Sequence, residues 1–355
     1  MTKKIFAPDS FTLQNAINFA EVVRNLEPEA EYTFDFSRTV GLIEPFGMLL
    51  VSSEIQRFVS AHPGCSISCS GYNHMSYAGH MGFFKAFGLD FGKRPGEASG
   101  SRHYIPVTIL RTEKIVDDAI ANGREVGDEV DNLCARISET LCANNTGDVF
   151  DTLQYSMREL IRNVIEHSEA KQFGFCSQFW PSKGRAEVAI LDRGIGLQRS
   201  LSPNPHLEAS DHKRAINYAL MPAVSGKAFK GARKPKRSSP WNNSGFGLYM
   251  TSRICRNGGN FFIGSGDTGM LLTSGKNAKR YFEMQHEGTV IRMVINTRNV
   301  QGLRESLARY RSEGEEIQRK YSEIVNIDPS SASLMLSNDF DLSLWERILK
   351  KIKGA

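Results

Sequence analysis

The chain lacks the features by which membrane-spanning, secreted and P-loop proteins are recognised. None of its apolar runs approaches the roughly 18 residues needed to cross a bilayer, and its first residues, MTKKIFAPDSF, lack the apolar core of a signal peptide. No GK dipeptide is followed by serine or threonine, so a Walker A loop is absent. We therefore expect a cytoplasmic protein that makes no membrane contact.

Cysteine pairs at metal-binding spacing are also missing. The six cysteines are scattered and form no CxxC pair, which argues against a structural zinc site. His62 and His74 flank Cys65 and Cys69, so a zinc site there stays an alternative.

The composition is that of a folded globular protein with an ample core. Hydrophobic residues make up 40% of the 355 residues and charged residues 23%, and the length suffices for two ordinary domains. Lysine and arginine are concentrated in residues 197–244, where nine of them stand against two acidic residues. Because the whole chain carries a net charge of +5, the remainder is slightly acidic, and the basicity reflects what this segment contacts.

Hydrophobic periodicity divides the chain into four parts. We predict an α/β domain over 1–105, a helical connector over 106–147, a motif-bearing domain over 148–298 and a helical extension over 299–355. In the first domain the predicted elements are helices near 13–26 and 46–59 and strands near 32–36 and 65–70. The connector opens with a short strand-like piece, VTIL, and contains no histidine after residue 105.

The chain is organised around the segment Tyr155–Ser168, YSMRELIRNVIEHS. Its apolar residues recur at helical spacing, so one side of the predicted helix faces a core. Glu159, Asn163 and His167 follow at intervals of four and therefore share another face. An amide oxygen is a hard ligand that suits Mg²⁺, and a carboxylate one turn away can take a proton from an attacking water. The alternative is an ordinary solvated polar face.

Two glycine motifs follow this helix. In LDRGIGL, at the end of a predicted strand, Asp192 can accept a hydrogen bond from an exocyclic amine, while Gly194 and Gly196 allow a tight turn against a ligand. The alternative for this motif is a plain turn. In SGFGL, Gly245 and Gly247 precede a predicted helix whose N-terminal N–H groups and dipole suit phosphates.

Two antiparallel strands, near 260–272 and 288–297, are predicted next. The first contains GSGDTG, which matches the dinucleotide-binding pattern in letters. That pattern requires a helix to open after it, and MLLTSG does not suit one, so we reject it in favour of a β-hairpin.

Taken in order, these motifs resemble those of the GHKL ATPases, a family that includes gyrase B, Hsp90, sensor histidine kinases, MutL and the anti-sigma-factor serine kinases. The resemblance covers about residues 148–297: a helix with Glu and Asn four apart, a strand ending in DxGxG, GxGL at a helix start, and a strand opened by Gly288-Thr289. It implies an α/β sandwich, the Bergerat fold, with a mixed, mainly antiparallel sheet that binds ATP and Mg²⁺.

The resemblance also implies a role for each motif residue. Asp192 would bind the adenine amino group, with Thr289 assisting through water. Asn163 would hold Mg²⁺ against the phosphates, and Glu159 would be the general base. His167 would contact the nucleotide or support the fold. The implied nucleotide-binding residues are Asn163, His167, Asp192, Gly194, Gly196, Lys227, Lys230, Gly245, Phe246, Gly247, Leu248 and Thr289.

Residues 197–244 correspond in position to the ATP lid of that family. A lysine or arginine brought down by lid closure would stabilise charge on the transferred phosphoryl group, and Lys227, Lys230 and Arg233 are the candidates. A solvated basic loop and a nucleic-acid-binding patch are the alternatives.

In the first domain, DFSRTVGLIEPFGMLL is similar to the STAS domain of anti-sigma-factor antagonists. Aligning Gly47 with the family glycine puts Glu44, Pro45 and Phe46 where the family has its acidic residue, its phosphorylated serine and the residue that follows. Because proline cannot accept phosphate, the resemblance implies that the family's switch is missing here. An unrelated small α/β domain is the alternative.

The last part of the chain predicts two amphipathic helices. Apolar residues in 300–324 follow the three-four spacing of a coiled-coil seam, which Gly314 interrupts. This helix would pair two chains in a homodimer or lie on its own domain. The second helix is predicted over 340–354.

Three functions fit these features. One is an ATP-driven conformational switch with slow hydrolysis that controls a regulatory protein partner. The second is a serine/threonine kinase of the anti-sigma-factor type, and the third is a nucleotide-binding module without catalysis. The intact Glu159 argues against the third, and the absence of an acceptor histidine from the connector argues against a histidine kinase. The long basic segment and the helical extension favour the switch.

Overall fold

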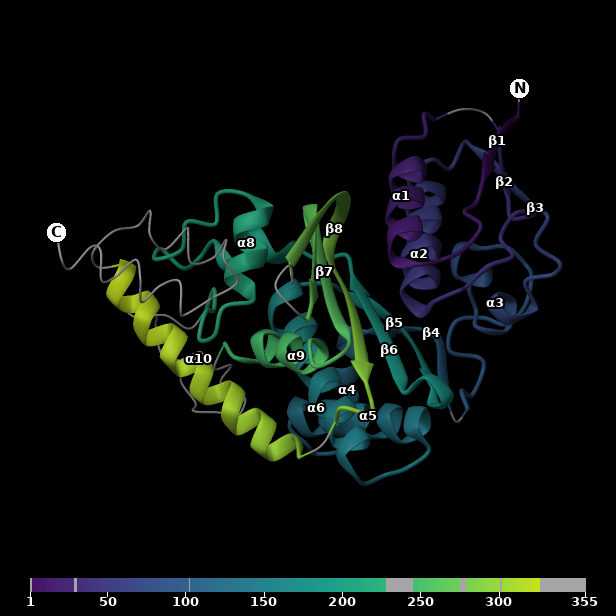
Figure 1. Cartoon of the computed structure of the whole chain (residues 1–355). Coiled ribbons are helices and arrows are strands. Elements are labelled where there is room, and N and C mark those ends of the chain that lie inside the picture. Colours follow the sequence, from purple (N-terminus) through teal and green to yellow (C-terminus); the bar gives the residue numbers. More distant parts are fainter. Residues whose placement is uncertain are drawn as a thin grey trace.

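The protein is a mixed α/β structure with two sheets (Figure 1). The structure, a computed structural model, describes residues 2–28, 31–101, 103–227, 245–274, 279–300 and 302–325. One sheet has three parallel strands and the other has five antiparallel strands, which confirms the predicted α/β class at this level. Over the described ranges, no helix is long and apolar enough to span a membrane.

The N-terminal module, defined here as residues 2–101, contains the parallel sheet. Its strands lie in the order β1-β2-β3, and helices α1 and α2 make the crossovers that parallel pairing requires. The predicted helices and strands are confirmed to within two residues at almost every boundary. In chain order the elements are β1 (Lys3–Phe6), α1 (Leu13–Arg24), β2 (Glu31–Asp35), α2 (Pro45–Ala61), β3 (Ser66–Ser70), α3 (Ser76–His80) and the 3₁₀ turn η1 (Lys85–Phe87).

The C-terminal module, residues 104–325, contains the antiparallel sheet in the order β4-β5-β6-β8-β7. The short strand predicted at VTIL is part of β4, which forms one edge of this sheet. GSGDTG lies within β7, no helix opens after it, and β7 pairs with β8, so the dinucleotide interpretation was rightly rejected. The strands are β4 (Tyr104–Arg111), β5 (Gln172–Trp180), β6 (Arg185–Asp192), β7 (Asn260–Thr273) and β8 (Lys279–Asn296).

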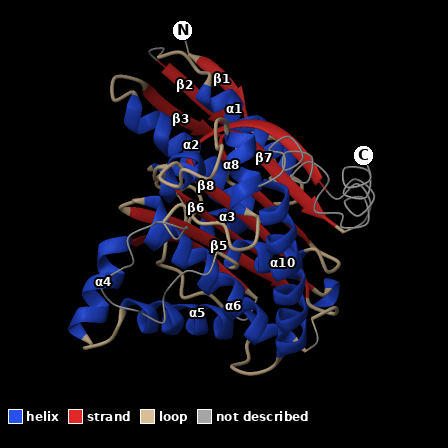
Figure 2. Ribbon diagram, turned by 90° about the vertical axis from the view of Figure 1, so that its left-hand side faces the viewer, coloured by secondary structure: helices blue, strands red, loops and turns tan. Residues whose placement is uncertain are grey.

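Helices of the C-terminal module cover one face of this sheet, and Figure 2 shows α5 and α6 running below its strands. Side chains of α5, α6 and α9 share a core with Val188 and Ile190 of β6. The helices and turns are α4 (Thr112–Ala121), α5 (Val126–Cys142), α6 (Asp148–Asn163), the π-helical turn η2 (Val164–Ser168), the 3₁₀ turn η3 (Pro181–Lys183), α7 (Gly196–Leu201), α8 (His212–Ala219), α9 (Gly247–Cys255) and α10 (Leu303–Val325).

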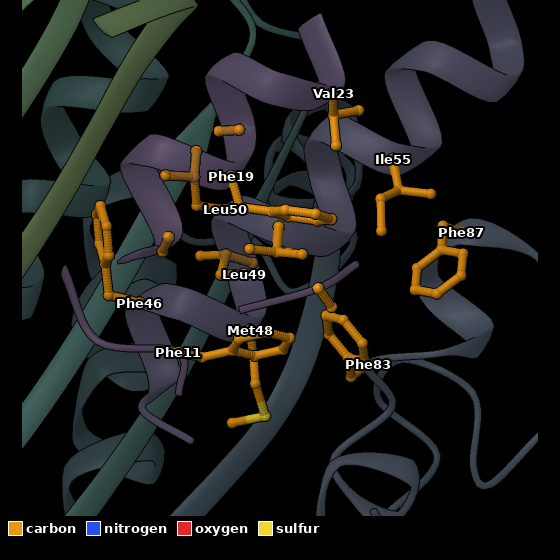
Figure 3. Packing of buried hydrophobic residues seen from close by; sticks show 14 of the residues in the cluster. Phe11, Phe19, Val23, Phe46, Met48, Leu49, Leu50, Ile55, Phe83 and Phe87 are labelled. Atoms are coloured by element: carbon orange, nitrogen blue, oxygen red, sulfur yellow. The ribbon is translucent and has the colours of Figure 1, made fainter. Parts of the chain in front are cut away.

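The other face of the sheet is covered by α1 and α2 of the N-terminal module, which lie between the two sheets (Figure 1). Ala189 and Leu191 of β6 point to this side because successive strand residues face opposite ways. Phe46, at the start of α2, packs edge-on against Phe262 of β7 with ring centroids 5.3 Å apart, and Figure 3 shows it beside Leu49 and Leu50. The two modules therefore share one hydrophobic core.

The start of α2 is buried in this interface. Pro45 is the first residue of the helix, where its fixed φ is favourable and its missing N–H costs nothing. The N–H of Phe46 donates to Glu187 Oε1 of β6 over 3.2 Å. Pro45, which the STAS resemblance aligns with the phosphorylated serine, is buried.

Helix α10 lies along the C-terminal module (Figure 1). Tyr310 and Ile317, on the face predicted as a coiled-coil seam, are buried, and Arg253 of α9 is ion-paired with Glu313. A Cβ at Gly314 would lie 2.7 Å from the ring of Phe246, so the glycine permits the close approach of the helix. The homodimer through the C-terminal helices stays a prediction, and the second predicted helix lies outside the described residues.

Replacing Phe46 with alanine tests whether the two modules fold as one unit. Removing a fully buried phenylalanine from a shared core is expected to cost about 3–5 kcal/mol of the free energy of unfolding. Urea denaturation should show one cooperative transition for both proteins, with a lower midpoint for the variant. Phe6→Ala, which removes a ring that is 42% exposed, is the control and should change stability by less than about 1 kcal/mol. Two separate transitions in the wild-type protein would contradict a shared core.

Candidate functional site

A cavity opens between α6, the end of β6, the middle of β8 and the start of α9. The space between these elements is about 760 Å³, a volume that includes open solvent. Eight of the predicted site residues line it: Asn163, His167, Asp192, Gly196, Gly245, Gly247, Leu248 and Thr289. These residues come from four separate segments of the chain, and the fold brings them to one place.

The helix that begins the site ends differently from its prediction. It starts at Asp148 and is α-helical to Asn163, after which Val164–Ser168 forms a π-helical turn. The prediction of one continuous α-helix from Glu159 to His167 was therefore wrong for its last turn. His167 nevertheless lines the cavity. Such π turns within helices are frequent at functional sites. The carbonyl oxygen of Ser168 accepts the N–H of Ile195, which ties this turn to the DRGIG segment.

Asn163 supplies a buried amide with unused hydrogen-bonding capacity. Its Nδ2 atom has no hydrogen-bond partner among the described residues, although it is shielded from solvent. A buried polar atom left unpaired costs about 1–3 kcal/mol, which a ligand in the cavity would recover. The two ends of an amide are interchangeable in this assignment, so the side chain can present a donor to an anion or an oxygen to a hard cation.

Asp192, the last residue of β6, is only 2% exposed and lies directly opposite Thr289 of β8 in the sheet register. Its Oδ1 accepts the N–H of Gly194 over 2.9 Å, and the side chain lines the cavity. Burial raises the pKa of Asp192, while the Gly194 N–H and the nearby imidazole of His286 oppose that rise. A buried carboxylate here is a strong acceptor for a donor on the ligand.

The turn after Asp192 has room for glycine only. A Cβ at Gly194 would lie 1.9 Å from the carbonyl oxygen of Ser168, and Gly196 has a φ of +70°. Ser265 fixes the turn: its hydroxyl accepts the N–H of Leu197 over 3.0 Å and donates to the carbonyl of Gly288 over 2.7 Å. Sequence reasoning missed Ser265, although it lies in the GSGDTG segment that was weighed for another role.

The second glycine motif forms the opposite wall. Gly245 has a φ of +72°, and α9 begins at Gly247, whose N-terminal N–H groups lie at the cavity. Phe246 does not line the cavity and instead packs against Tyr249 and α10. The floor is apolar and is made by Leu160, Val164, Leu197, Leu201, Leu248, Ile263 and Ile291.

Glu159 lies behind this wall and does not line the cavity. A Cβ at Gly247 would be 2.2 Å from Glu159 Oε2, so the carboxylate touches the start of α9. Burial raises the pKa of Glu159, although the charges of Arg162 and Arg158 act in the opposite direction. A carboxylate with a raised pKa is suited to proton transfer near neutral pH.

The described part of residues 197–244 reaches the cavity through α7, α8 and the segment after α8. Ser200, Ala219, Ser225 and Gly226 line it, and none of them was predicted. Lys227 does not line the cavity; its ammonium group donates to the carbonyl oxygen of Glu166, next to His167. Lys230 and Arg233, the other predicted lid cations, lie outside the described residues.

No metal site is formed by protein groups alone in the part of the chain that the structure describes. Three or more His, Cys, Asp or Glu side chains do not gather there in any arrangement that could hold an ion. The alternative of a zinc site at Cys65 and Cys69 therefore has no support. A metal at Asn163 would need ligands from a bound anion, which is how Mg²⁺ is usually held beside phosphates.

The stability of the protein should depend on the protonation of His167. Burial, together with the charges of Lys227 and Arg162, lowers the pKa of His167 from 6.5 to about 4. Between these values the unfolded chain binds more protons than the folded one, so stability falls as the pH falls. From pH 7 to pH 5 this group alone should remove about 2 kcal/mol of unfolding free energy.

Urea denaturation at pH 7 and pH 5 checks this expectation. The His167→Gln variant should lose less stability than the wild-type protein over this interval, whereas His206→Gln, which changes an exposed histidine, should lose as much as the wild type. An equal loss in the His167 and His206 variants would contradict the expectation.

Comparison of the chain with protein-family models, with curated proteins and with solved structures finds no match.

Proposed function

We propose that the protein binds ATP with Mg²⁺ in this cavity and acts as a nucleotide-driven conformational switch of the GHKL type. The observation that carries the proposal is the convergence of Asn163, Asp192, Gly247 and Thr289 on one cavity. In the resemblance these residues hold the metal, the adenine and the phosphates. The five-stranded sheet is antiparallel throughout, whereas the resemblance implies a mixed, mainly antiparallel one; the helices α5, α6 and α9 on one face agree with the sandwich that it implies.

Asp192 and the apolar floor suit a purine. The carboxylate of Asp192 accepts the N–H of Gly194 and also interacts with the backbone N–H of Thr289, but its two oxygens offer about four lone-pair sites, so it can still accept an exocyclic amine. The leucine and isoleucine side chains of the floor would stack against the base, as in most small-molecule sites. An acceptor at this place favours adenine, because guanine carries a carbonyl oxygen at the corresponding position.

The phosphates would lie between Asn163 and the start of α9. The free N–H groups and positive dipole end of α9 attract anions, and Gly247 allows the backbone to come close to them. Mg²⁺ bound with the phosphates would neutralise part of their charge. The unpaired amide of Asn163 can bind either the phosphates or Mg²⁺. Lys227 lies nearby, on the segment that would close over the site.

Glu159 would act as the general base that accepts a proton from the attacking water. It touches Gly247 from behind, so a small movement of the start of α9 would open a path from its carboxylate to the cavity. The raised pKa of Glu159 suits a base that must accept and release a proton. Slow hydrolysis follows if this path opens rarely.

Contacts of α10 favour a switch over a kinase. A Cβ at Gly314 would lie 3.1 Å from Pro222, in the segment that follows α8, and 2.7 Å from Phe246 in the GFGL motif. Any closure of these two walls around a nucleotide therefore moves the surface on which α10 rests. The altered position of α10 is what a regulatory protein partner, or a second copy of the chain, would recognise.

Calorimetric titration with a non-hydrolysable ATP analogue, with and without Mg²⁺, tests nucleotide binding. Asp192→Asn should weaken binding about 10- to 100-fold because it replaces a charged acceptor. Asn163→Ala should abolish the Mg²⁺ dependence. The matched control is Asp35→Asn, since Asp35 also ends a strand and accepts the N–H two residues on, far from the cavity. Unchanged affinity in both cavity variants would contradict the site.

Turnover separates the switch from the kinase. With ATP labelled on the γ-phosphate, a switch releases free phosphate and a kinase leaves the label on protein. Glu159→Gln should lower either rate about 10²- to 10⁴-fold while leaving binding of the analogue intact. Glu129→Gln, which alters a buried carboxylate on α5, is the control and should leave the rate unchanged. Equal loss of binding and turnover in the Glu159 variant would mean that its role is structural.

A further inference from the structure

Glu54 of α2 is a completely buried carboxylate at the interface of the two modules. Its Oε1 lies 2.8 Å from Arg193 Nη2 and 3.5 Å from His286 Nδ1, both of the C-terminal module. Its Oε2 lies 2.8 Å from Arg57 Nε and 3.5 Å from Arg24 Nη2, both of the N-terminal module. One carboxylate thus balances three guanidinium groups and an imidazole.

Both C-terminal partners of Glu54 act on the backbone of Asp192. Arg193 is the next residue in the chain, and its guanidinium also donates to the hydroxyl of Ser53. His286 Nε2 donates to the carbonyl oxygen of Asp192 over 3.0 Å. The peptide unit between Asp192 and Arg193, directly after the Asp192 side chain, is therefore held by groups that Glu54 and its neighbour Ser53 contact.

The electrostatics of this cluster favour a fixed geometry. Burial acts to raise the pKa of Glu54, but contact with His286 and the charge of Arg193 outweigh it and hold the pKa well below its usual value. The carboxylate is thus charged at any ordinary pH. Removing it would leave the guanidinium of Arg193 without its ionic partner in a region with little water, and the side chain would have to move.

We propose that Glu54 is a positioning residue for the nucleotide site: from the N-terminal module it holds, through Arg193 and His286, the backbone that aims Asp192 into the cavity. The proposal rests on the proposed function for its effect on nucleotide affinity. It makes α1 and α2 part of the site's supporting structure. Displacement of the N-terminal module would then lower nucleotide affinity, which gives that module a means of control.

A second buried ion cluster in the same interface supplies a matched control. Glu44, at the start of α2, contacts Arg185 and Arg292, and Glu187 completes the cluster. Glu44 and Glu54 are ten residues apart along α2, which corresponds to about 15 Å at the rise of a helix. Both clusters join the modules, but only that of Glu54 touches the Asp192 turn.

The experiment compares Glu54→Gln with Glu44→Gln in the full chain. Three quantities are measured: the melting temperature, the affinity for the non-hydrolysable ATP analogue, and the amide hydrogen exchange of residues 192–197 without nucleotide. Both variants should melt at a lower temperature. Only Glu54→Gln should lower the affinity for the analogue at least tenfold and speed amide hydrogen exchange at residues 192–197. A purely structural role of Glu54 would change these two quantities in both variants or in neither.

A milder pair of variants keeps the test decisive if Glu54→Gln does not fold. Ser53→Ala removes the hydroxyl that Arg193 contacts, whereas Ser52→Ala removes one that bonds only within α2. Ser53→Ala should lower the affinity for the analogue several-fold and speed amide hydrogen exchange at residues 192–197. Ser52→Ala should change neither quantity.

Equal effects of the paired variants, or unchanged exchange at 192–197 in Glu54→Gln and Ser53→Ala, would overturn the proposal. If the wild-type protein binds no nucleotide, the proposed function fails. The exchange measurement then still decides whether Glu54 holds the turn.

Discussion

The register of β6 against β8 is the constraint on which the candidate site depends. It sets Asp192, the last residue of β6, opposite Thr289 in the middle of β8, where the glycine turn and the start of α9 meet the sheet. Because side chains alternate along a strand, a slip of one residue would turn Asp192 away from the cavity. The register is secured by burial on both faces: Val188 and Ile190 pack on one side, and Ala189 and Leu191 on the other.

Burial on both faces also explains the charged clusters between the modules. A sheet covered by helices on each side has no solvated face, so polar residues in its strands need partners inside the protein. Glu187 finds them in Arg185, Arg292 and the N–H of Phe46. Ion pairs of this kind add little net stability but penalise any other arrangement, because each partner would be left charged and unpaired. They therefore fix how the N-terminal module sits on the sheet.

The two sides of the cavity differ in how firmly they are held. Strands β6 and β8 and helix α6 lie wholly in the main core, whereas α8 joins that core through Ile216 and also shares a second, smaller core with α7 around Leu201, Ala215, Tyr218 and Met221. Helix α10 touches this side of the cavity through Gly314, which places α10 where it can respond to the state of the site.

The sequence by itself determined the local elements and the motif positions, because periodicity, glycine turns and helix starts depend on neighbouring residues. It therefore indicated Asn163, Asp192, Gly247 and Thr289, which line one cavity. Only the tertiary structure decided what depends on residues far apart in the chain. The π turn before Ser168, the hydroxyl of Ser265 on the glycine turn, and the burial of Pro45 and Glu54 each reflect packing between distant segments. Local pattern carries no signal of such contacts, since the same residues would suit an exposed surface equally well.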